Sequence, residues 1–246
     1  MIGVIGAGKM GIQLVRLLSK TENVIFVARD IDKAKSDYAI RYPSEMINSS
    51  SFNDFDRIEF THSISELAAC KIVFECLPEI FDLKINYINN ISKTFFGPIA
   101  SCTSTISLGK MKNHLVNADK VNVVHFSNPI SSTKIAEVVF AENIDKNEKT
   151  LIANLLAKLS VDYVEVPDID GFVINSLLFP LLYKSIQIHM NFAISKFDID
   201  NLMKKGCKFP MGPFEIINLV GVDTVLAVFK NLNLEVDSNL IAALKK

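Results

Sequence analysis

The fold is decided by the first eleven residues, Met1-Ile2-Gly3-Val4-Ile5-Gly6-Ala7-Gly8-Lys9-Met10-Gly11. A short apolar run leads directly into three glycines with the spacing G-x-G-x-x-G. Apolar residues then recur at the spacing of a buried helix face, at Ile12, Leu14, Val15, Leu17 and Leu18. A strand, a glycine turn and a helix in this order are the context in which the glycine pattern predicts a dinucleotide-binding site.

Each glycine has a separate physical reason to be there. Gly6 permits the tight turn out of the strand, Gly8 lets a pyrophosphate approach the backbone, and Gly11 lets the helix pack closely on the strand. The free N–H groups at the start of the helix, where Lys9 and Met10 stand, would then hold the anion. The alternative is a glycine turn that only closes a strand onto a helix.

A candidate ribose-binding carboxylate follows at the expected distance. The apolar run from Val24 to Ala28 ends in Arg29-Asp30, and Asp30 follows Gly11 after 19 positions (30 minus 11). About 20 positions are expected for the carboxylate that binds the adenosine ribose hydroxyls. Arg29 is suited to a 2′-phosphate, so we favour NAD and keep NADP as the alternative.

Composition excludes several classes of function. The chain has 246 residues, a net charge of −1 and 49% hydrophobic residues, as in an ordinary globular protein. It has no long Lys/Arg cluster for nucleic acid, no uncharged apolar stretch of about 18 residues, and no signal-peptide leader. The cysteines form no C-x-x-C pair, so we expect free thiols, no metal site and a cytoplasmic location.

Strand and helix patterns alternate over the first two thirds of the chain. Predicted strands cover 72–74, 98–101, 121–126, 135–140 and 161–166. Helices are predicted from Ser65 and over 79–94, and the buried face of the second would carry Ile80, Leu83, Tyr87 and Ile91. The segment through Tyr42-Pro43 and 48–51 is predicted as a short helix and a loop. This alternation predicts an α/β fold with a Rossmann-type, doubly wound, mostly parallel sheet.

The strand pattern ends near Pro167-Asp168-Ile169-Asp170-Gly171, which predicts a domain boundary. We expect a dinucleotide-binding domain over 1–167 and an all-helical domain over 168–246. Its helices are predicted at 172–194 with an interruption at Pro180, and at 198–205, 213–220, 222–231 and 238–244. A domain of roughly 80 residues is marginal alone, so its apolar content predicts packing on the first domain and on a partner subunit.

Polar residues stand where ligands bind in such folds, beyond the carboxyl ends of the strands. His125, at the end of a predicted strand, is the candidate base, and Glu137, 12 positions later, is the carboxylate that would orient it. Ser104 and Asn175 are candidate donors to a substrate oxygen. The alternatives are a core histidine, a glutamate on an exposed strand face, a turn serine and a structural asparagine.

The chain resembles the L-3-hydroxyacyl-CoA dehydrogenase (3-hydroxybutyryl-CoA dehydrogenase) family over nearly its whole length, as a compact variant. The matching stretches are Ile5 to Gly11, Phe74-Glu75 through Glu79, Ala100 to Ser104, His125-Phe126-Ser127-Asn128-Pro129 to Glu137, Gly171 to Asn175, and Pro210 to Glu215. Their order and spacing also fit the family. Together they are far more specific than any one motif.

The resemblance implies a role for each matching residue. His125 would be the base in the oxidative direction and Glu137 its partner, while Ser104 and Asn175 would bind the substrate oxygen. Glu79, Lys84 and Ser104 lie where the family contacts the nicotinamide half of NAD. The glycine turn and Asp30 would hold the rest of the cofactor, and the helical domain would dimerise and cover the acyl site.

Three departures from the family pattern bear on the substrate. The segment from Asp30 to Phe60 leaves little room for the helical hairpin that binds the CoA nucleotide. Hydroxyls follow His125 at Ser131-Ser132-Thr133, where the family has an apolar stretch facing the acyl chain, which favours a short or polar acyl group. The basic C-terminal tail of the family has no counterpart in this sequence, whose last residue is Lys246. Cys102, in place of the usual asparagine, has no clear consequence.

The leading hypothesis is an NAD-dependent dehydrogenase acting on a short 3-hydroxyacyl thioester. The short CoA-binding segment favours a variant in which an acyl carrier protein presents the thioester, as in polyketide-type pathways. A second variant is a free hydroxy acid. The hypothesis from another class is an NAD-binding scaffold without activity, which the retention of the base, its partner and both donors argues against.

Overall fold

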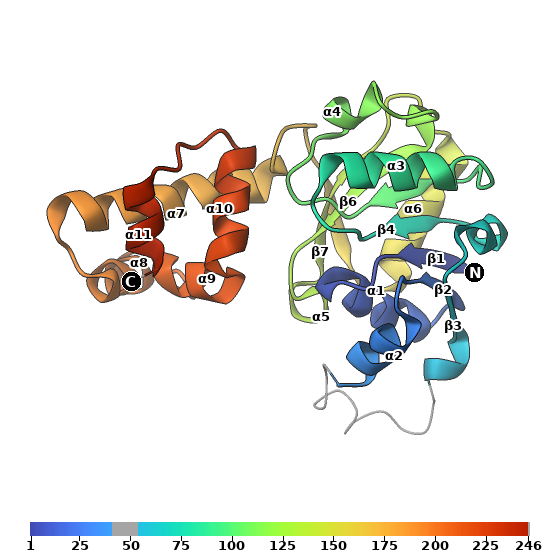
Figure 1. The fold of residues 1–246 in the computed structure, drawn as a ribbon, viewed down its shortest axis with the longest axis horizontal. Coiled ribbons are helices and arrows are strands. Elements are labelled where there is room, and N and C mark those ends of the chain that lie inside the picture. Colours follow the sequence, from blue (N-terminus) through green and yellow to red (C-terminus); the bar gives the residue numbers. More distant parts are fainter. Residues whose placement is uncertain (41–53, 246) are drawn as a thin grey trace. The chain divides into compact units, whose positions relative to one another are not determined.

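The computed structural model describes residues 1–40 and 54–245 (Figure 1). Two compact units make up the chain, Met1–Asp168 and Ile169–Lys246. The segment after Asp30 was predicted as a short helix and a loop. It begins with the helix at Ile31–Ile40, and its remainder through 42–51 lies outside the described residues. The four cysteines are all free thiols.

The first unit is built on one sheet of eight strands in the order β3-β2-β1-β4-β5-β6-β7-β8. Their bounds are β1 Ile2–Ile5, β2 Val24–Val27, β3 Ile58–Thr61, β4 Val73–Glu75, β5 Ile99–Ser101, β6 Val121–Phe126, β7 Ile135–Val139 and β8 Asp162–Glu165. All neighbouring strands are parallel except β6 and β7, which run antiparallel. The predicted doubly wound, mostly parallel sheet is therefore confirmed.

Helices cover both faces of this sheet (Figure 1). On one face, α1 (Lys9–Ser19), α2 (Ile31–Ile40) and α6 (Lys146–Lys158) share a core with strand residues such as Val4, Phe26 and Phe126. On the other, a Cβ at Gly3 would lie 2.6 Å from Leu67 of the 3₁₀ helix η2 (Ile64–Ala69), which packs with α3 (Phe81–Ile91). Because strand side chains alternate between faces, each strand anchors both layers.

Shorter elements complete the first unit. They are η1 (Asp54–Arg57), α4 (Leu108–Lys112), η3 (Ala118–Lys120) and α5 (Ile130–Thr133). The important feature for function is the reversal of direction at the centre of the sheet. The chain leaves β3 at one edge and returns to β4 on the other side of β1, so the carboxyl ends of β1, β4 and β5 meet at a topological switch point.

The second unit is entirely helical among its described residues. It contains α7 (Phe172–Phe192), α8 (Lys196–Gly206), α9 (Pro213–Val220), α10 (Val222–Asn231) and α11 (Ser238–Lys245). Phe229 of α10 lies at its core, with its ring edge-on to Phe179 at 6.1 Å and to Tyr183 at 5.3 Å. The carboxylate of Asp200 accepts hydrogen bonds from the backbone N–H groups of Phe214 and Glu215, so α8 caps the start of α9.

Two predicted helices differ from those observed. Helix α7 runs through Pro180 without interruption, because Pro180 lies on its exposed face, where water can satisfy the carbonyl that loses a partner. Helix α3 buries Ile91 as predicted, together with Lys84, Ile85 and Ile88, whereas Leu83 and Tyr87 of the predicted face are half-buried. Ile80 precedes the helix in extended conformation and is 58% exposed.

The segment predicted as a helix from Ser65 forms the 3₁₀ helix η2, whereas strand β3 was missed. β3 is an edge strand of four residues with an exposed Glu59, so its alternation is too short to stand out. Among the described helices, none combines the length and the apolar character needed to cross a membrane.

Candidate active site

The glycine turn between β1 and α1 leaves space for a ligand at one position only. A Cβ at Gly6, whose φ is +107°, would lie 2.5 Å from the carbonyl oxygen of Cys76, and one at Gly11 would lie 1.9 Å from the carbonyl oxygen of Gly6. At Gly8 the nearest atom would be 4.0 Å away, and Gly8 and Lys9 are exposed. The protein therefore fills the space around two of the glycines and leaves Gly8 open.

The start of α1 fits an anion. Its first turn carries no acidic residue, and no side chain caps its N–H groups. Uncapped N–H groups beside an open glycine are the features that a pyrophosphate requires. At the end of β2, Asp30 Oδ1 accepts a hydrogen bond from the Lys33 N–H at 2.8 Å and so begins α2. These residues fit the phosphate and ribose groups of a dinucleotide.

A single carboxylate oxygen organises the turn after β5. Glu79 Oε1 accepts hydrogen bonds from the backbone N–H groups of Ser104 and Thr105 at 2.9 and 2.8 Å. The hydroxyls of Thr103, Thr105 and Ser104 donate to the same oxygen at 2.6, 2.8 and 3.4 Å. Glu79 therefore fixes the conformation of the turn that carries Ser104, one of the predicted substrate-binding residues.

Beneath Glu79 lies a buried ion pair between Glu75 and Lys84. Lys84 is 1% exposed and Glu75 is fully buried. Lys84 Nζ lies 2.9 and 3.2 Å from the two Glu75 oxygens, 3.1 Å from the carbonyl oxygen of Leu77 and 3.4 Å from Glu79 Oε2. Glu75 also accepts hydrogen bonds from Ser101 Oγ at 2.6 Å and from the Leu77 N–H at 2.7 Å.

The charged forms of Glu79 and Lys84 are both stabilised by their neighbours. Burial alone would raise the pKa of Glu79, but Lys84 and the hydrogen bonds from Thr103 and Thr105 outweigh it and lower that pKa. Burial would likewise lower the pKa of Lys84, but Glu75 and Glu79 outweigh it and raise that pKa. Both groups are therefore charged near neutral pH. Sequence reasoning placed Lys84 beside the cofactor and missed its pairing with Glu75, because nothing in the sequence shows that Lys84 is buried.

His125 and Glu137 face each other across the one antiparallel pair of the sheet. The register of β6 and β7 places His125 directly opposite Glu137. His125 Nδ1 lies 2.8 Å from Glu137 Oε2, and both residues are buried. A carboxylate can only accept, so Nδ1 carries the donated proton and Nε2 carries the lone pair. The structure brings the two predicted residues together and buries Glu137, so the exposed-face alternative does not apply.

Asn175, the remaining predicted residue, belongs to the helical unit. It lies in the first turn of α7, where its backbone N–H donates to the carbonyl oxygen of Gly171 at 3.1 Å. It is 8% exposed. Its role in binding substrate stays a prediction.

A glycine turn at a topological switch point, with a buried histidine–carboxylate pair at the same edge of the sheet, defines the class of dinucleotide-dependent dehydrogenases. Residues 1–169 match the family model "3-hydroxyacyl-CoA dehydrogenase, NAD binding domain", and residues 171–244 match "3-hydroxyacyl-CoA dehydrogenase, C-terminal domain". The chain therefore belongs to the 3-hydroxyacyl-CoA dehydrogenase family of NAD-dependent oxidoreductases.

Individual relatives agree with this assignment. Hydroxyacyl-coenzyme A dehydrogenase, mitochondrial, of Rattus norvegicus is 28% identical over 243 residues, covering 91% of this chain and 76% of the relative. The 3-hydroxybutyryl-CoA dehydrogenase of Clostridioides difficile is 29% identical over 203 residues, which cover 82% of this chain and 68% of the relative. The crystal structure of (S)-3-hydroxybutyryl-CoA dehydrogenase PaaH1 from Ralstonia eutropha matches with a TM-score of 0.85 at 27% identity. The match covers 94% of this chain and 86% of that structure's chain.

Two glycine variants separate cofactor binding from folding. Gly8→Ala should leave the melting temperature near that of the wild type, because the nearest atom that its Cβ would meet, the Cys76 carbonyl oxygen, is 4.0 Å away. It should weaken NADH binding about tenfold or more, because the methyl group fills the space that the pyrophosphate needs. Gly11→Ala, the control, should lower the melting temperature, because its Cβ collides with Gly6. NADH fluorescence titration measures the affinity and thermal unfolding measures the stability. An NADH affinity in Gly8→Ala equal to that of the wild type would contradict pyrophosphate binding at this turn.

A double-mutant cycle tests the buried ion pair. Lys84→Met should destabilise the protein by about 3–5 kcal/mol, because it leaves the Glu75 carboxylate buried without its cation. Adding Glu75→Gln should recover much of this loss, because the amide is neutral and still accepts from Ser101. Urea unfolding measures all four free energies. A cost below about 1 kcal/mol for Lys84→Met would mean that water or another cation compensates the charge.

Proposed function

We propose that this protein interconverts a short or polar 3-hydroxyacyl thioester and its 3-oxoacyl form, with NAD as the cofactor. The observation that carries the proposal is the buried hydrogen bond between His125 and Glu137, at the edge of the sheet that also bears the glycine turn and the Ser104 turn. Alcohol oxidation requires a base for the hydroxyl proton and donors for the oxygen as charge shifts.

In the oxidative direction, His125 Nε2 accepts the proton of the substrate's 3-hydroxyl group. Glu137 holds the other ring nitrogen, fixes the tautomer and stabilises the imidazolium that results. When bound, NAD accepts the hydride that leaves C3. In the reductive direction, the protonated His125 returns the proton to the oxygen.

Ser104 and Asn175 are proposed to donate hydrogen bonds to the same substrate oxygen. Support for Ser104 comes from Glu79, which fixes the residue through its backbone N–H at 2.9 Å. The Ser104 hydroxyl lies 3.4 Å from the same carboxylate oxygen, a long contact, so its single proton can turn to a substrate oxygen instead. A donor with a fixed position costs less to reorganise during the reaction than one on a mobile turn. Asn175 would contribute its donor from the first turn of α7.

The cofactor would be held by residues at three strand ends. The pyrophosphate would lie on the glycine turn and the start of α1, which together comprise Gly6, Gly8, Lys9, Met10 and Gly11. Asp30 would bind the adenosine ribose, which favours NAD, with NADP as the alternative that Arg29 supports. Glu79, Lys84 and Ser104 are proposed for the nicotinamide side, where Lys84 would act through Glu79, since its Nζ lies among Glu75, Leu77 and Glu79.

The substrate proposal draws on the hydroxyl-rich turn after His125. Thr133 Oγ1 lies within hydrogen-bond reach of the carbonyl oxygens of Ser127 and Pro129, and Ser132 Oγ donates to Pro129. These bonds tie the turn together and leave the hydroxyl oxygens as acceptors. A polar wall loses hydrogen bonds when hydrocarbon covers it, which supports a short or polar acyl group.

The first experiment follows NADH oxidation with acetoacetyl-CoA, with acetoacetyl on an acyl carrier protein, and with free acetoacetate. We expect turnover of a thioester, and CoA thioesters are named for the relatives. Faster turnover of the carrier-bound form would support the carrier variant, and turnover of the free acid alone would support the hydroxy-acid variant. His125→Asn should lose at least about 10²-fold in kcat, with a smaller loss for Glu137→Gln. NADH binding without turnover of any of these substrates would favour the scaffold alternative.

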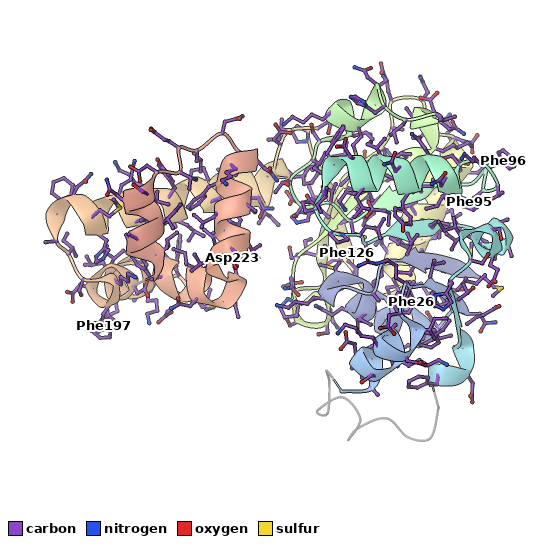
Figure 2. All side chains as sticks on the ribbon, viewed as in Figure 1. Phe26, Phe95, Phe96, Phe126, Phe197 and Asp223 are labelled. Carbon is purple, nitrogen blue, oxygen red and sulfur yellow. The ribbon has the colours of Figure 1, made fainter. Side chains whose placement is uncertain are left out.

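We also propose that the helical unit forms a homodimer. Large apolar side chains are exposed on this unit, including Leu177 at 70%, Phe197 at 72%, Leu202 at 65% and Leu219 at 69%. Phe197 points outward from its helix (Figure 2). Apolar side chains exposed in such number on a unit of this size are typical of a surface that binds another protein.

Sedimentation at micromolar concentration tests the dimer. The wild type should sediment as a dimer, and the double variant Phe197→Glu, Leu202→Glu should shift toward monomer, because burying two carboxylates is costly. The matched control is Phe96→Glu, which alters an equally exposed phenylalanine, at 71%, on the dinucleotide-binding unit (Figure 2). A monomeric wild type would contradict the proposal.

A further inference from the structure

A glutamine on helix α1 is hydrogen-bonded to the turn that follows the proposed base. Gln13 Nε2 donates to Asn128 Oδ1 at 2.8 Å, and the backbone N–H of Ile130 donates to Gln13 Oε1 at 3.0 Å. Gln13 lies two residues after the last glycine of the dinucleotide-binding turn, and Asn128 lies three residues after His125. One side chain therefore joins the helix of the cofactor turn to the turn after His125.

The chemistry of this contact determines which end of each amide faces which partner. A backbone N–H can only donate, so the Gln13 oxygen must face Ile130 and its NH₂ must face Asn128. Asn128 must then turn its oxygen toward Gln13. Its Nδ2 group is left pointing away from Gln13, and it makes no hydrogen bond within the residues that the structure describes. Asn128 is exposed, so this donor is accessible to a ligand.

We infer that Gln13 is a positioning residue, which orients the Asn128 amide so that its NH₂ offers a donor to a carbonyl oxygen of the bound reactants. This inference rests on the proposed function, because it assumes that the reactants bind next to His125. Gln13 itself touches no reactant. Its effect is exerted through Asn128 and through the backbone of the turn at Ile130.

Two substitutions of Gln13 separate the orientation of the amide from the attachment of the turn. In Gln13→Met both hydrogen bonds are lost. In Gln13→Glu the carboxylate can still accept from Ile130, but it cannot donate to Asn128. Asn128 must then rotate its amide to offer NH₂ to the carboxylate, and it presents its oxygen to the reactants. The turn stays attached while the donor is replaced by an acceptor.

The experiment combines steady-state kinetics with hydrogen exchange at the Ile130 amide. Both variants should lower kcat/KM for acetoacetyl-CoA reduction about tenfold or more, because a donor to the reactants is lost or misplaced. Exchange at Ile130 should accelerate in Gln13→Met and stay slow in Gln13→Glu. Binding of ADP-ribose, measured by calorimetry, should stay within twofold of the wild type in both, because the glycine turn is unchanged. The control is Lys20→Gln, at the other end of α1, with wild-type kinetics.

The outcomes distinguish this inference from the proposed function. A wild type that turns over none of the substrates would refute the proposed function, whatever happens at Ile130. An active wild type and a Gln13→Glu variant of equal kcat/KM would overturn the positioning role. Unchanged Ile130 exchange in Gln13→Met would overturn the attachment of the turn. Weaker binding of ADP-ribose would mean that Gln13 acts on the helix, which would also overturn the inference.

Discussion

The buried ion pair between Glu75 and Lys84 is the interaction on which the candidate site depends. Two charges inside a protein are tolerated only when their geometry and hydrogen bonds offset the loss of water. Here Ser101, the Leu77 N–H and the Leu77 carbonyl complete the set of partners. The pair fixes Lys84, Lys84 holds Glu79, and Glu79 holds the Ser104 turn. The position of Ser104, a half-buried residue of the candidate site, thus follows from charges two contacts away from it.

The central part of the fold was predictable because its signals are local and strong. The glycine turn, the long apolar strands and the end of the β pattern near Pro167 each follow from short stretches of sequence. His125 and Glu137 were also identifiable, since a glutamate inside an apolar strand requires a partner. Their contact depends on the antiparallel pairing of β6 and β7, a tertiary feature, so the sequence indicated the candidates without their geometry.

The features that were missed depend on contacts between distant segments. The predicted buried face of its helix did not include Lys84, because a lysine in a helical pattern is normally solvated. Its burial depends on contacts with Glu75, with Glu79 and with the Leu77 carbonyl oxygen. Pro180 was predicted to interrupt α7, because the sequence does not show which face of a helix meets solvent. The contacts of Gln13 with Asn128 and Ile130 span more than a hundred residues and leave no mark on local patterns.

The antiparallel register of β6 and β7 has a consequence for how the family can vary. Successive strand residues point to opposite faces, so moving β7 by one residue against β6 would turn the Glu137 side chain away from His125. Apart from Asn128, which Gln13 holds, the side chains of the connection between the strands, residues 127–134, can therefore change more readily than the length that sets the register. Substitutions in this connection can therefore alter substrate preference. Insertions and deletions that shift the register would separate Glu137 from His125. A tightly specified histidine–carboxylate pair thus lies next to a loop whose composition can vary more readily than its length.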